Sequence, residues 1–554
     1  MTSLLIHAPV SVAQSLRTSL SNELWRFGPG IFDIAGVPFA SSTGKDRAYR
    51  LCRLLKFFAE NDHVTFSSMT EYGVGSGILS WHVLTLLRQH FPDIYDQIQI
   101  RLTDGSIDLL EQLLVQRHWS SHRHKVSAHA VNITEPDTDP CFDTSFAYST
   151  YLLCCLPVRD IEIVNGKVYE WLVQTSIDKS ATLVDTAGYL PRILNARQIV
   201  RLSREPHSKR RLLYAGKLLE LVQETYTRVP IEQSPGLEGE EYEDLMAYIQ
   251  SFKALPELRF NYSFAAGRHI QSVLTRLKPE GAYLINDFGH ASTINPLKQC
   301  DLFSSYGNAT FYSIFFPYLI YKAQAAGAQC AILRTMPTNY ELICYKGSRF
   351  SVCKTLFEQA FNKLGQAQAV FEKRLARLTP EDPMQTVLKY HRRLPLYERV
   401  NHHVLGRLAV FAFKREAWKV SIYYTKKSLE GYRHVAARAY FRIGLCYQEM
   451  GQHSKALVNF KKFIKMAPYL KDPYWELMQY YFNQKNHKAV LSALKKCIRY
   501  SQDNEVWPLY IALAQAYLKD GKTQQAHRIL RRIQDLDKSH PGHIPDSVLR
   551  SIPS

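Results

Sequence analysis

The sequence predicts an α/β domain of the doubly wound, Rossmann-like kind, followed by an all-α solenoid. Strand-like and helix-like stretches alternate between residues 64 and 185, and a glycine-rich turn joins the first strand to the first helix. Residues 401–541 repeat with a period of about 34 residues. A length of 554 residues with 46% hydrophobic and 21% charged residues fits several globular domains and excludes a disordered or coiled-coil chain.

The first half of the α/β domain has the clearest alternation. Strands are predicted within residues 64–72, 98–104, 125–133 and 144–150. Between them, the apolar spacing of 78–91 and 107–119 predicts helices. Alternation of this kind places ligands at the carboxyl ends of the strands.

The second half resumes after an insertion at about 187–258, which we expect to be helical. A fifth strand is predicted within 275–290, and 328–347 reads as a terminal antiparallel pair. The insertion carries a basic run at 198–217, which either forms a solvated face or covers the mouth of the site. An acidic stretch at 237–245 is a possible partner for that run or for the basic repeats.

The turn EYGVGSG is the first candidate site. Gly73, Gly75 and Gly77 remove side chains where a ligand must touch the backbone, and the following helix N-terminus offers free N–H groups. Glu71 precedes the first glycine by two residues, where a carboxylate suits an ammonium group, or it is a solvated turn residue.

Two polar residues end the next strands. Asp104 is placed to accept both hydroxyls of a ribose, or to cap a helix. Asn132 is a candidate contact for an adenine edge, or a turn cap. Because the ammonium group belongs to S-adenosylmethionine and not to nicotinamide cofactors, Glu71 and Asp104 together favour S-adenosyl-L-methionine.

The chain resembles the MidA-type class I methyltransferases, whose mitochondrial member assists complex I assembly. The resemblance covers roughly residues 20–345. It is carried by four stretches: EYGVGSG, TDGSIDLLEQL, YSTYLLCCLPVRDIEIVNGKVYEWLV and GAYLINDFGH. It implies a class I methyltransferase fold, S-adenosyl-L-methionine as cofactor, and methylation of a protein side chain, arginine in the family.

The chain departs from the family where the acceptor is handled. Thr150, Tyr151 and Cys154 stand where the family presents an Asn-Glu pair and an Asp. A guanidinium acceptor needs a carboxylate to orient it and to stabilise its charge. Asp287 and Glu71 are possible substitutes, so Asp287, Tyr151 and Thr150 are the catalytic candidates. Tyr151 can pack on the sulfonium or the adenine, or be a rim aromatic. The alternative function is an adaptor that has lost turnover.

The C-terminal part resembles the tetratricopeptide repeat. Its clearest unit has Tyr440, Gly444, Ala456, Phe460 and Pro468 at the period's contact positions, where a small residue lets two helices approach. About four units are expected, and repeats of this type bind protein partners. We expect linker helices at 366–400, with the boundary near 378–393, and a tail at 542–554. Residues 1–50 and 51–365 then form the N-terminal segment and the methyltransferase-like domain.

Charge and cysteines indicate the partner and the compartment. Of the net charge of +19, residues 401–554 carry +15, from 26 Lys and Arg against 11 Asp and Glu. Such a field attracts an acidic protein segment, nucleic acid or an anionic membrane. We expect a protein partner at the repeats, with an acidic segment as one option; nucleic acid is the weaker alternative, since no nucleic-acid motif is evident, and a merely solvated basic face stays open. Ten cysteines without a CxxC spacing, no transmembrane run and no secretory signal predict a cytoplasmic protein. No metal site is expected, the histidines at 118–129 included.

Overall fold

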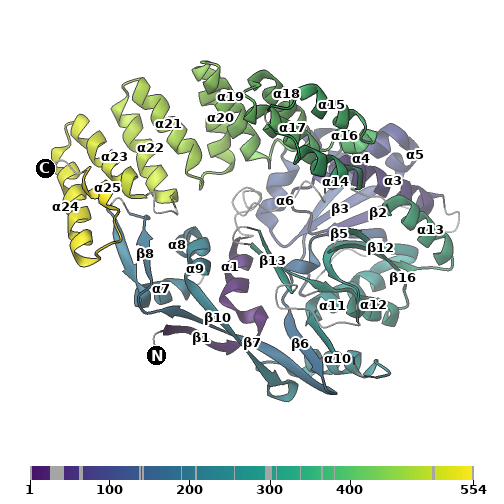
Figure 1. The fold of residues 1–554 in the computed structure, drawn as a ribbon. Coiled ribbons are helices and arrows are strands. Elements are labelled where there is room, and N and C mark those ends of the chain that lie inside the picture. The colour runs from purple at the N-terminus through teal and green to yellow at the C-terminus, as the bar shows by residue number, and fades with distance from the viewer. Residues whose placement is uncertain are drawn as a thin grey trace.

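The computed structural model combines two β-sheets, their covering helices and an arc of paired helices (Figure 1). It describes residues 3–24, 43–60, 67–135, 139, 143–188, 190–205, 209–254, 256–293, 302–306, 309–336, 338–362, 366–379, 381–501 and 506–551.

The larger sheet confirms the doubly wound, Rossmann-like prediction. Its strand order is β16-β17-β12-β5-β2-β3-β4, and β15 (Ile314–Phe315) pairs with β12. The parallel strands are β2 (Ser68–Tyr72), β3 (Gln99–Asp104), β4 (Val126–Ala130), β5 (Thr144–Thr150) and β12 (Leu277–His290). Strand β17 (Asn339–Lys346) is antiparallel to both β12 and β16 (Gln329–Met336). The strand order reverses between β2 and β5, which is where such sheets bind ligands.

Helices cover both faces of this sheet because its strands are apolar on both sides. On one face pack α3 (Lys45–Ala59), α4 (Ile78–His90), α5 (Pro92–Gln97), α6 (Ile107–Leu114) and α13 (Phe350–Phe361). On the other face pack α10 (Gly239–Gln250), α11 (Phe264–Arg276) and α12 (Phe316–Ala325). Successive strand residues point to opposite layers, as Tyr148 and Ala147 of β5 do.

The second sheet forms a long arm with the order β1-β7-β6-β11, and β10 also pairs with β7. Its strands are β1 (Ser3–Val10), β6 (Arg159–Val164), β7 (Lys167–Asp178), β10 (Val222–Pro230) and β11 (Leu258–Tyr262). Asn165 and Gly166 turn β6 into β7 with φ of 50° and 71°, as a tight two-residue hairpin requires. The hairpin lies in the VNGxVYEW stretch.

The insertion differs from the helical expectation. It contains α7 (Ala196–Ser203), α8 (Lys209–Leu213) and α9 (Ala215–Leu221), but also strand β10 and a hairpin of β8 (Thr182–Asp185) and β9 (Arg192–Asn195). The reason is the free edge of β7, which β10 covers over nine consecutive residue pairs.

The C-terminal part is a helical array, as predicted. Its described helices form four pairs: α17 (His402–Lys414) with α18 (Trp418–Ser428), α19 (Ala437–Glu449) with α20 (His453–Met466), α21 (Asp472–Asn483) with α22 (His487–Tyr500), and α23 (Val506–Lys519) with α24 (Thr523–Ser539). The short α25 (Asp546–Leu549) follows. Before the array come α14 (Gln366–Leu375), α15 (Met384–Arg392) and α16 (Leu396–Arg399), of which α14 and α15 share a core with α17.

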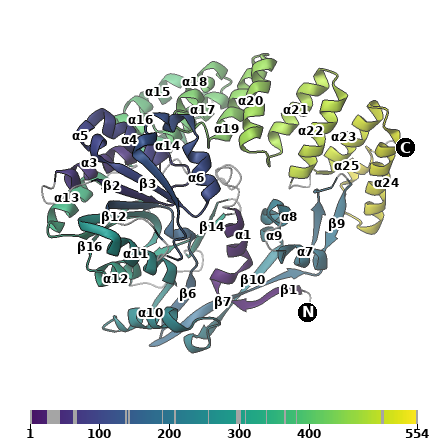
Figure 2. The same cartoon turned by 180° about the vertical axis from the view of Figure 1, so that it is seen from behind.

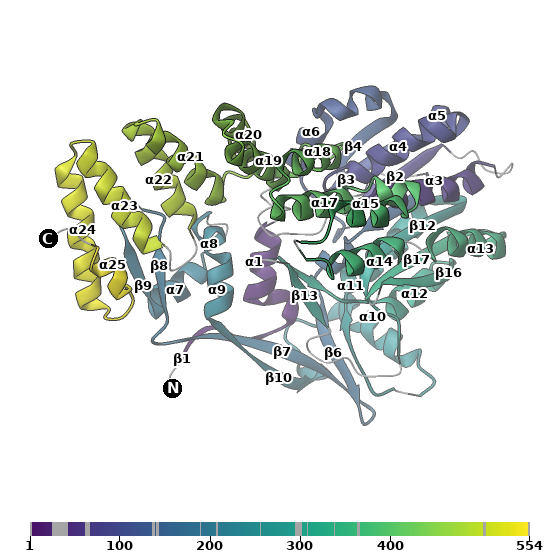
Figure 3. The same cartoon turned by 45° about the horizontal axis from the view of Figure 1, so that its top comes forward.

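Both ends of the array touch the α/β half of the molecule (Figures 2 and 3). At the near end, Ile78 of α4 belongs to the same apolar cluster as Leu429 and Ile443. At the far end, Val184 and Ile193 of the β8–β9 hairpin pack on the core of α22 to α24. The array therefore extends from α4 to the β8–β9 hairpin of the insertion, and the chain forms a closed ring of contacts.

Two predictions from the sequence concern membrane-spanning helices and the state of the cysteines. Within the part of the chain that the structure describes, no helix combines the length and apolarity that a bilayer crossing needs. The described cysteines are free thiols.

Candidate active site

A glycine loop, residues 73–77, joins β2 to α4 at the point where the strand order reverses. Gly73, Gly75 and Gly77 have φ of 68°, 49° and 67°, a left-handed conformation that other residues rarely adopt. A Cβ at Gly73 would lie 2.6 Å from Leu152 Cδ1, and one at Gly77 would lie 2.6 Å from Leu113 Cδ1. Conformation and packing both require glycine at these two positions.

Asp104 ties this loop to the end of β3. Its Oδ2 accepts the N–H of Gly75 at 3.1 Å, and its Oδ1 accepts the N–H of Ser106 at 3.2 Å. The cap of α6 is Ser106, whose hydroxyl accepts the N–H of Leu109. Among the described residues, the backbone N–H groups of Gly75, Gly105 and Ser106 stabilise the carboxylate; because two carboxylate oxygens offer about four lone-pair sites, capacity remains for an external hydroxyl. Burial raises the pKa of Asp104.

Glu71 lies beneath the loop, only 3% exposed, and accepts a hydrogen bond from Ser80 of α4. Burial, with a smaller contribution from the nearby Asp104 charge, raises the pKa of this carboxyl to about 7. Ser80 opposes the shift by donating to the ionised form. Glu71 is therefore a buried acid beside the glycine loop, and it is not a solvated turn residue.

Asn132 follows β4 at the same edge of the sheet and is exposed. Its Oδ1 accepts the backbone N–H of Thr134 at 3.2 Å and the Thr134 hydroxyl at 2.8 Å, which makes it a turn cap. The next N–H upstream, that of Val131, donates to the carbonyl of Asp104 at 2.9 Å. The structure thus brings Glu71, the glycine loop, Asp104 and Asn132 to one edge.

Thr150 and Tyr151 lie across the reversal point, at the end of β5. Tyr151 has φ of 49°, a strained value for a residue with a side chain. Its N–H donates to the carbonyl of Asn286 at 2.9 Å, and its phenol oxygen accepts from the amide of Asn339. Thr150 is half-buried and pairs in register with Asn286 of β12.

Asp287 is fully buried, and its carboxylate holds the turn after Tyr151. Oδ2 accepts the N–H groups of Leu153 and Cys154 at 2.9 and 3.1 Å, and Oδ1 accepts that of Phe288 at 2.9 Å. Burial raises its pKa to about 7. These contacts make Asp287 an anchor of the backbone, and the geometry gives it no opening toward an external group.

A chain of buried polar side chains beside Tyr151 escaped the sequence analysis. Arg47 of α3 pairs with Glu341 of β17 through two contacts of 2.8 and 3.1 Å. The Asn286 amide donates to Glu341 at 2.9 Å and to Asn339 at 2.7 Å, and Asn339 reaches Tyr151. The five residues come from four distant parts of the chain, namely α3, the end of β5, β12 and β17, so no motif joins them. The sequence signal for this network is Glu341, because it is a charged residue within an apolar strand and a buried charge needs a partner.

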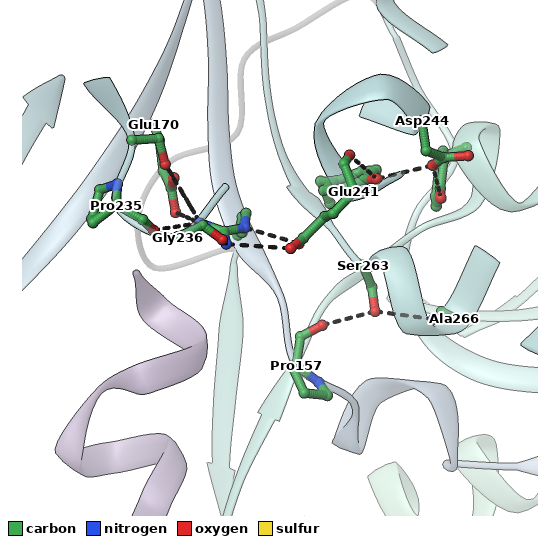
Figure 4. A network of polar contacts seen from close by, with 12 residues as sticks. Pro157, Glu170, Pro235, Gly236, Glu241, Asp244, Ser263 and Ala266 are labelled. Atoms are coloured by element: carbon green, nitrogen blue, oxygen red, sulfur yellow. Dashed lines mark hydrogen bonds and ion pairs between the residues drawn. The ribbon is translucent and has the colours of Figure 1, made fainter. Parts of the chain in front are cut away.

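In the described part of the chain, the ion pairs of the acidic stretch 237–245 are made with Arg159 and Lys322, and with neither the basic run nor the repeats (Figure 4). Glu241 accepts from Arg159 Nε at 2.9 Å, while Arg159 also pairs with the buried Glu170 at 3.1 Å. Asp244 pairs with Lys322. Together with the Ser263 hydroxyl, which donates to the Pro157 carbonyl at 2.8 Å, this network fixes the segment that connects Tyr151 to β6.

The described residues of the basic run, 198–205 and 209–217, do not cover the glycine loop. They form α7 to α9 in the insertion, beside α1 (Leu16–Leu24) and away from α4 in Figure 1. Two arginines of the run are paired: Arg210 with Asp185 at 2.8 Å and Arg211 with Glu23 at 2.6 Å. Among the described residues, no group of three His, Cys, Asp or Glu side chains is arranged to hold a metal ion.

The residues at the sheet edge fit S-adenosyl-L-methionine. Asp104 keeps acceptor capacity for ribose hydroxyls. Of the described residues, only the Val131 carbonyl would contact a Cβ built on the adjacent Gly105, at 4.0 Å, so they leave the backbone there open to a ligand. The first N–H groups of α4 follow the glycine loop, where they suit an anionic end such as a carboxylate.

Comparison with protein families agrees with this geometry. Residues 53–311 match the family described as "Putative S-adenosyl-L-methionine-dependent methyltransferase", and residues 437–469 match the tetratricopeptide repeat. S-Adenosyl-L-methionine is the cofactor of the first family.

Individual proteins are more distant. A protein of Burkholderia thailandensis bound to S-adenosyl-homocysteine is 14% identical, with a TM-score of 0.37, over 70% of this chain and 88% of that one. MamA of Desulfovibrio magneticus is 16% identical, with a TM-score of 0.26, over 32% of this chain and 96% of that one. The RNA polymerase-associated protein CTR9 of Caenorhabditis elegans is 36% identical over 61 residues, which are 11% of this chain and 5% of that protein.

Proposed function

We propose that this protein methylates a side chain of a protein substrate, since residues 53–311 match the family described as "Putative S-adenosyl-L-methionine-dependent methyltransferase" and a tetratricopeptide repeat follows. The observation that carries the proposal is the convergence of Asp104 and the glycine loop at the reversal point of the sheet. The basic repeats would recruit an acidic protein partner.

On the cofactor side, Asp104 would accept the ribose hydroxyls and Asn132 would contact the adenine edge. Glu71 and the loop backbone would hold the amino-acid end. The cofactor supplies a methyl group on a sulfonium, and the protein contributes chiefly binding and orientation.

On the acceptor side, Tyr151 and Thr150 face the reversal point from β5. Family resemblance implies arginine as the acceptor. Glu341 is a buried carboxylate connected to Tyr151 through Asn286 and Asn339. It is as fully buried as Asp287, and Arg47 already neutralises it, so Glu341 would act on an acceptor only by positioning Tyr151.

Cofactor binding is tested by calorimetric titration of the full chain with S-adenosyl-homocysteine. We expect Asp104→Ala to weaken binding at least tenfold, because a ribose hydroxyl loses a charged acceptor. Asp108→Ala is the matched control, because Asp108 is an exposed acid on the same connection. Wild-type protein that gives no heat would remove the cofactor from the proposal.

Transfer is tested with tritium-labelled S-adenosyl-L-methionine and lysate proteins. Label in protein that becomes weaker with Tyr151→Ala supports the enzyme. Binding of the cofactor without any transfer supports the alternative, an adaptor that keeps the fold and has lost turnover.

A further inference from the structure

The repeat array contacts the glycine loop directly. His434 lies in the connection between α18 and α19, and its Nε2 donates to the carbonyl of Ser76 at 2.8 Å. Ser76 is the fourth residue of the loop and is only 3% exposed. A side chain more than 350 positions downstream thus fixes the backbone that would surround the cofactor.

The orientation of the His434 ring is fixed. It stacks on the ring of His118 with centroids 4.6 Å apart and an interplanar angle of 27°. Burial lowers the pKa of His434, so the ring is neutral at pH 7 and carries a single N–H. Because a carbonyl can only accept, that proton lies on Nε2, and Nδ1 has no hydrogen-bond partner among the residues that the structure describes.

The rest of this connection fits the first turn of α4. We call residues 429–436 the loop brace. Ile78, the first residue of α4, is fully buried against Leu429, Tyr432 and Val435 of the brace. Gly431 has φ of 81°, and a Cβ there would lie 2.5 Å from the Trp81 ring. The brace and α4 are therefore shaped to each other along their contact.

This contact matters because the loop must hold its N–H groups in place for a ligand. A loop that is already in the binding geometry loses less entropy when the ligand arrives and so binds more tightly. Three left-handed glycines make the loop conformationally free in the unfolded chain, and an external hydrogen bond to its fourth carbonyl restricts it.

We propose that His434 is a positioning residue for the glycine loop, and that the repeat array therefore forms part of the cofactor site. This rests on the proposed function, since it assigns a role at the same site. The catalytic domain and the repeats are then one binding unit, and cofactor affinity depends on the seating of α18 and α19 against α4.

The test uses the full chain and two readouts. S-Adenosyl-homocysteine affinity is measured by calorimetry, and hydrogen exchange of residues 73–77 is measured without ligand. We expect His434→Leu to weaken binding about tenfold and to speed exchange in the loop. His434→Gln keeps an N–H near the Nε2 position and should stay within about threefold of wild type. His453→Leu, an exposed histidine of α20, is the control.

Should the leucine variant fail to fold, His434→Asn replaces it, because the shorter amide cannot reach Ser76. Affinity and loop exchange that are unchanged in the variants without the hydrogen bond would overturn the inference. Wild-type protein that binds no ligand would overturn the proposed function instead, and the exchange measurement would still decide whether His434 restrains the loop.

Discussion

The sequence identifies Glu71 as a candidate ligand, but it does not reveal the burial or the pKa of this acid. Its position two residues before a glycine turn identified it as a ligand candidate. Only the structure shows that α4 covers it, that Ser80 donates to it and that desolvation raises its pKa to about 7. The acid is therefore partly protonated at neutral pH.

This shift predicts a pH-dependent stability effect of Glu71→Gln. The folded pKa lies above the ordinary value of 4.5, so the contribution of Glu71 to stability is complete below pH 4.5 and is lost as the pH rises through about 7. Glutamine has no charge to bury. We expect the variant to gain on wild type by up to about 3 kcal/mol at pH 8.5 and by little at pH 5.

Thermal unfolding of both proteins from pH 5 to pH 8.5 measures this difference. Glu111→Gln, an exposed acid of α6, should show no such trend. A constant difference between Glu71→Gln and wild type at all pH values would contradict the assignment.

The residues that sequence reasoning found share one property: they lie at or directly after the end of a strand, within a recognisable local pattern. Glu71, Asp104 and the three glycines are of this kind. Arg47, Glu341 and His434 are not, because each acts through a partner at least 290 positions away. Asp287 stood at the expected strand end, but the pattern could not show that three backbone N–H groups occupy its oxygens.

At the scale of elements, apolar runs predicted the strands of the large sheet because these are buried on both faces. The β10 strand was missed for the opposite reason. Its residues alternate between half-buried and exposed along the edge of the arm, and the surrounding charges read as helix. The partner that makes it a strand is β7, which is more than 40 residues upstream.

Two glycines of the array give predictions of opposite sign. A Cβ at Gly444 of α19 would lie 2.4 Å from the buried Phe460 ring, so Gly444→Ala should separate α19 from α20 and destabilise the protein by about 1–3 kcal/mol. A Cβ at Gly406 of α17 would meet nothing within 4 Å, so Gly406→Ala should stabilise by about 0.5–1 kcal/mol.

Denaturant unfolding of the two variants measures both effects. Because the chemical change is the same, each variant serves as the control for the other. Equal effects of the two substitutions would mean that α19 and α20 are not in close contact at Gly444.

At the scale of the whole molecule, the phenol of Tyr214 supports the contact between the β8–β9 hairpin and the far end of the array. Tyr214 donates to Asp185 at 2.8 Å and accepts the N–H groups of Thr186 and Ala187 at 2.6 and 3.0 Å. The Thr186 hydroxyl in turn donates to the carbonyl of Arg499 in α22 at 3.2 Å. Tyr510 adds a hydrogen bond of 3.3 Å to the carbonyl of Gly188.

We expect Tyr214→Phe to destabilise the protein by about 1–3 kcal/mol, because it leaves buried N–H groups without an acceptor. Hydrogen exchange should become faster in residues 506–539 as their support loosens. Tyr226→Phe is the control, since it removes one hydrogen bond to Glu224 on the arm and leaves the β8–β9 hairpin intact. Faster exchange at the far end in both variants, or in neither, would count against this support.

Contact with the α/β half at both ends of the array has a mechanical consequence. A solenoid with one free end can change its curvature when it binds a partner. Here α4 holds one end of the array and the β8–β9 hairpin holds the other, so twisting and unwinding of the array are restricted before any partner binds. A protein partner would have to match this preset curvature, because the array could not adjust its curvature on binding.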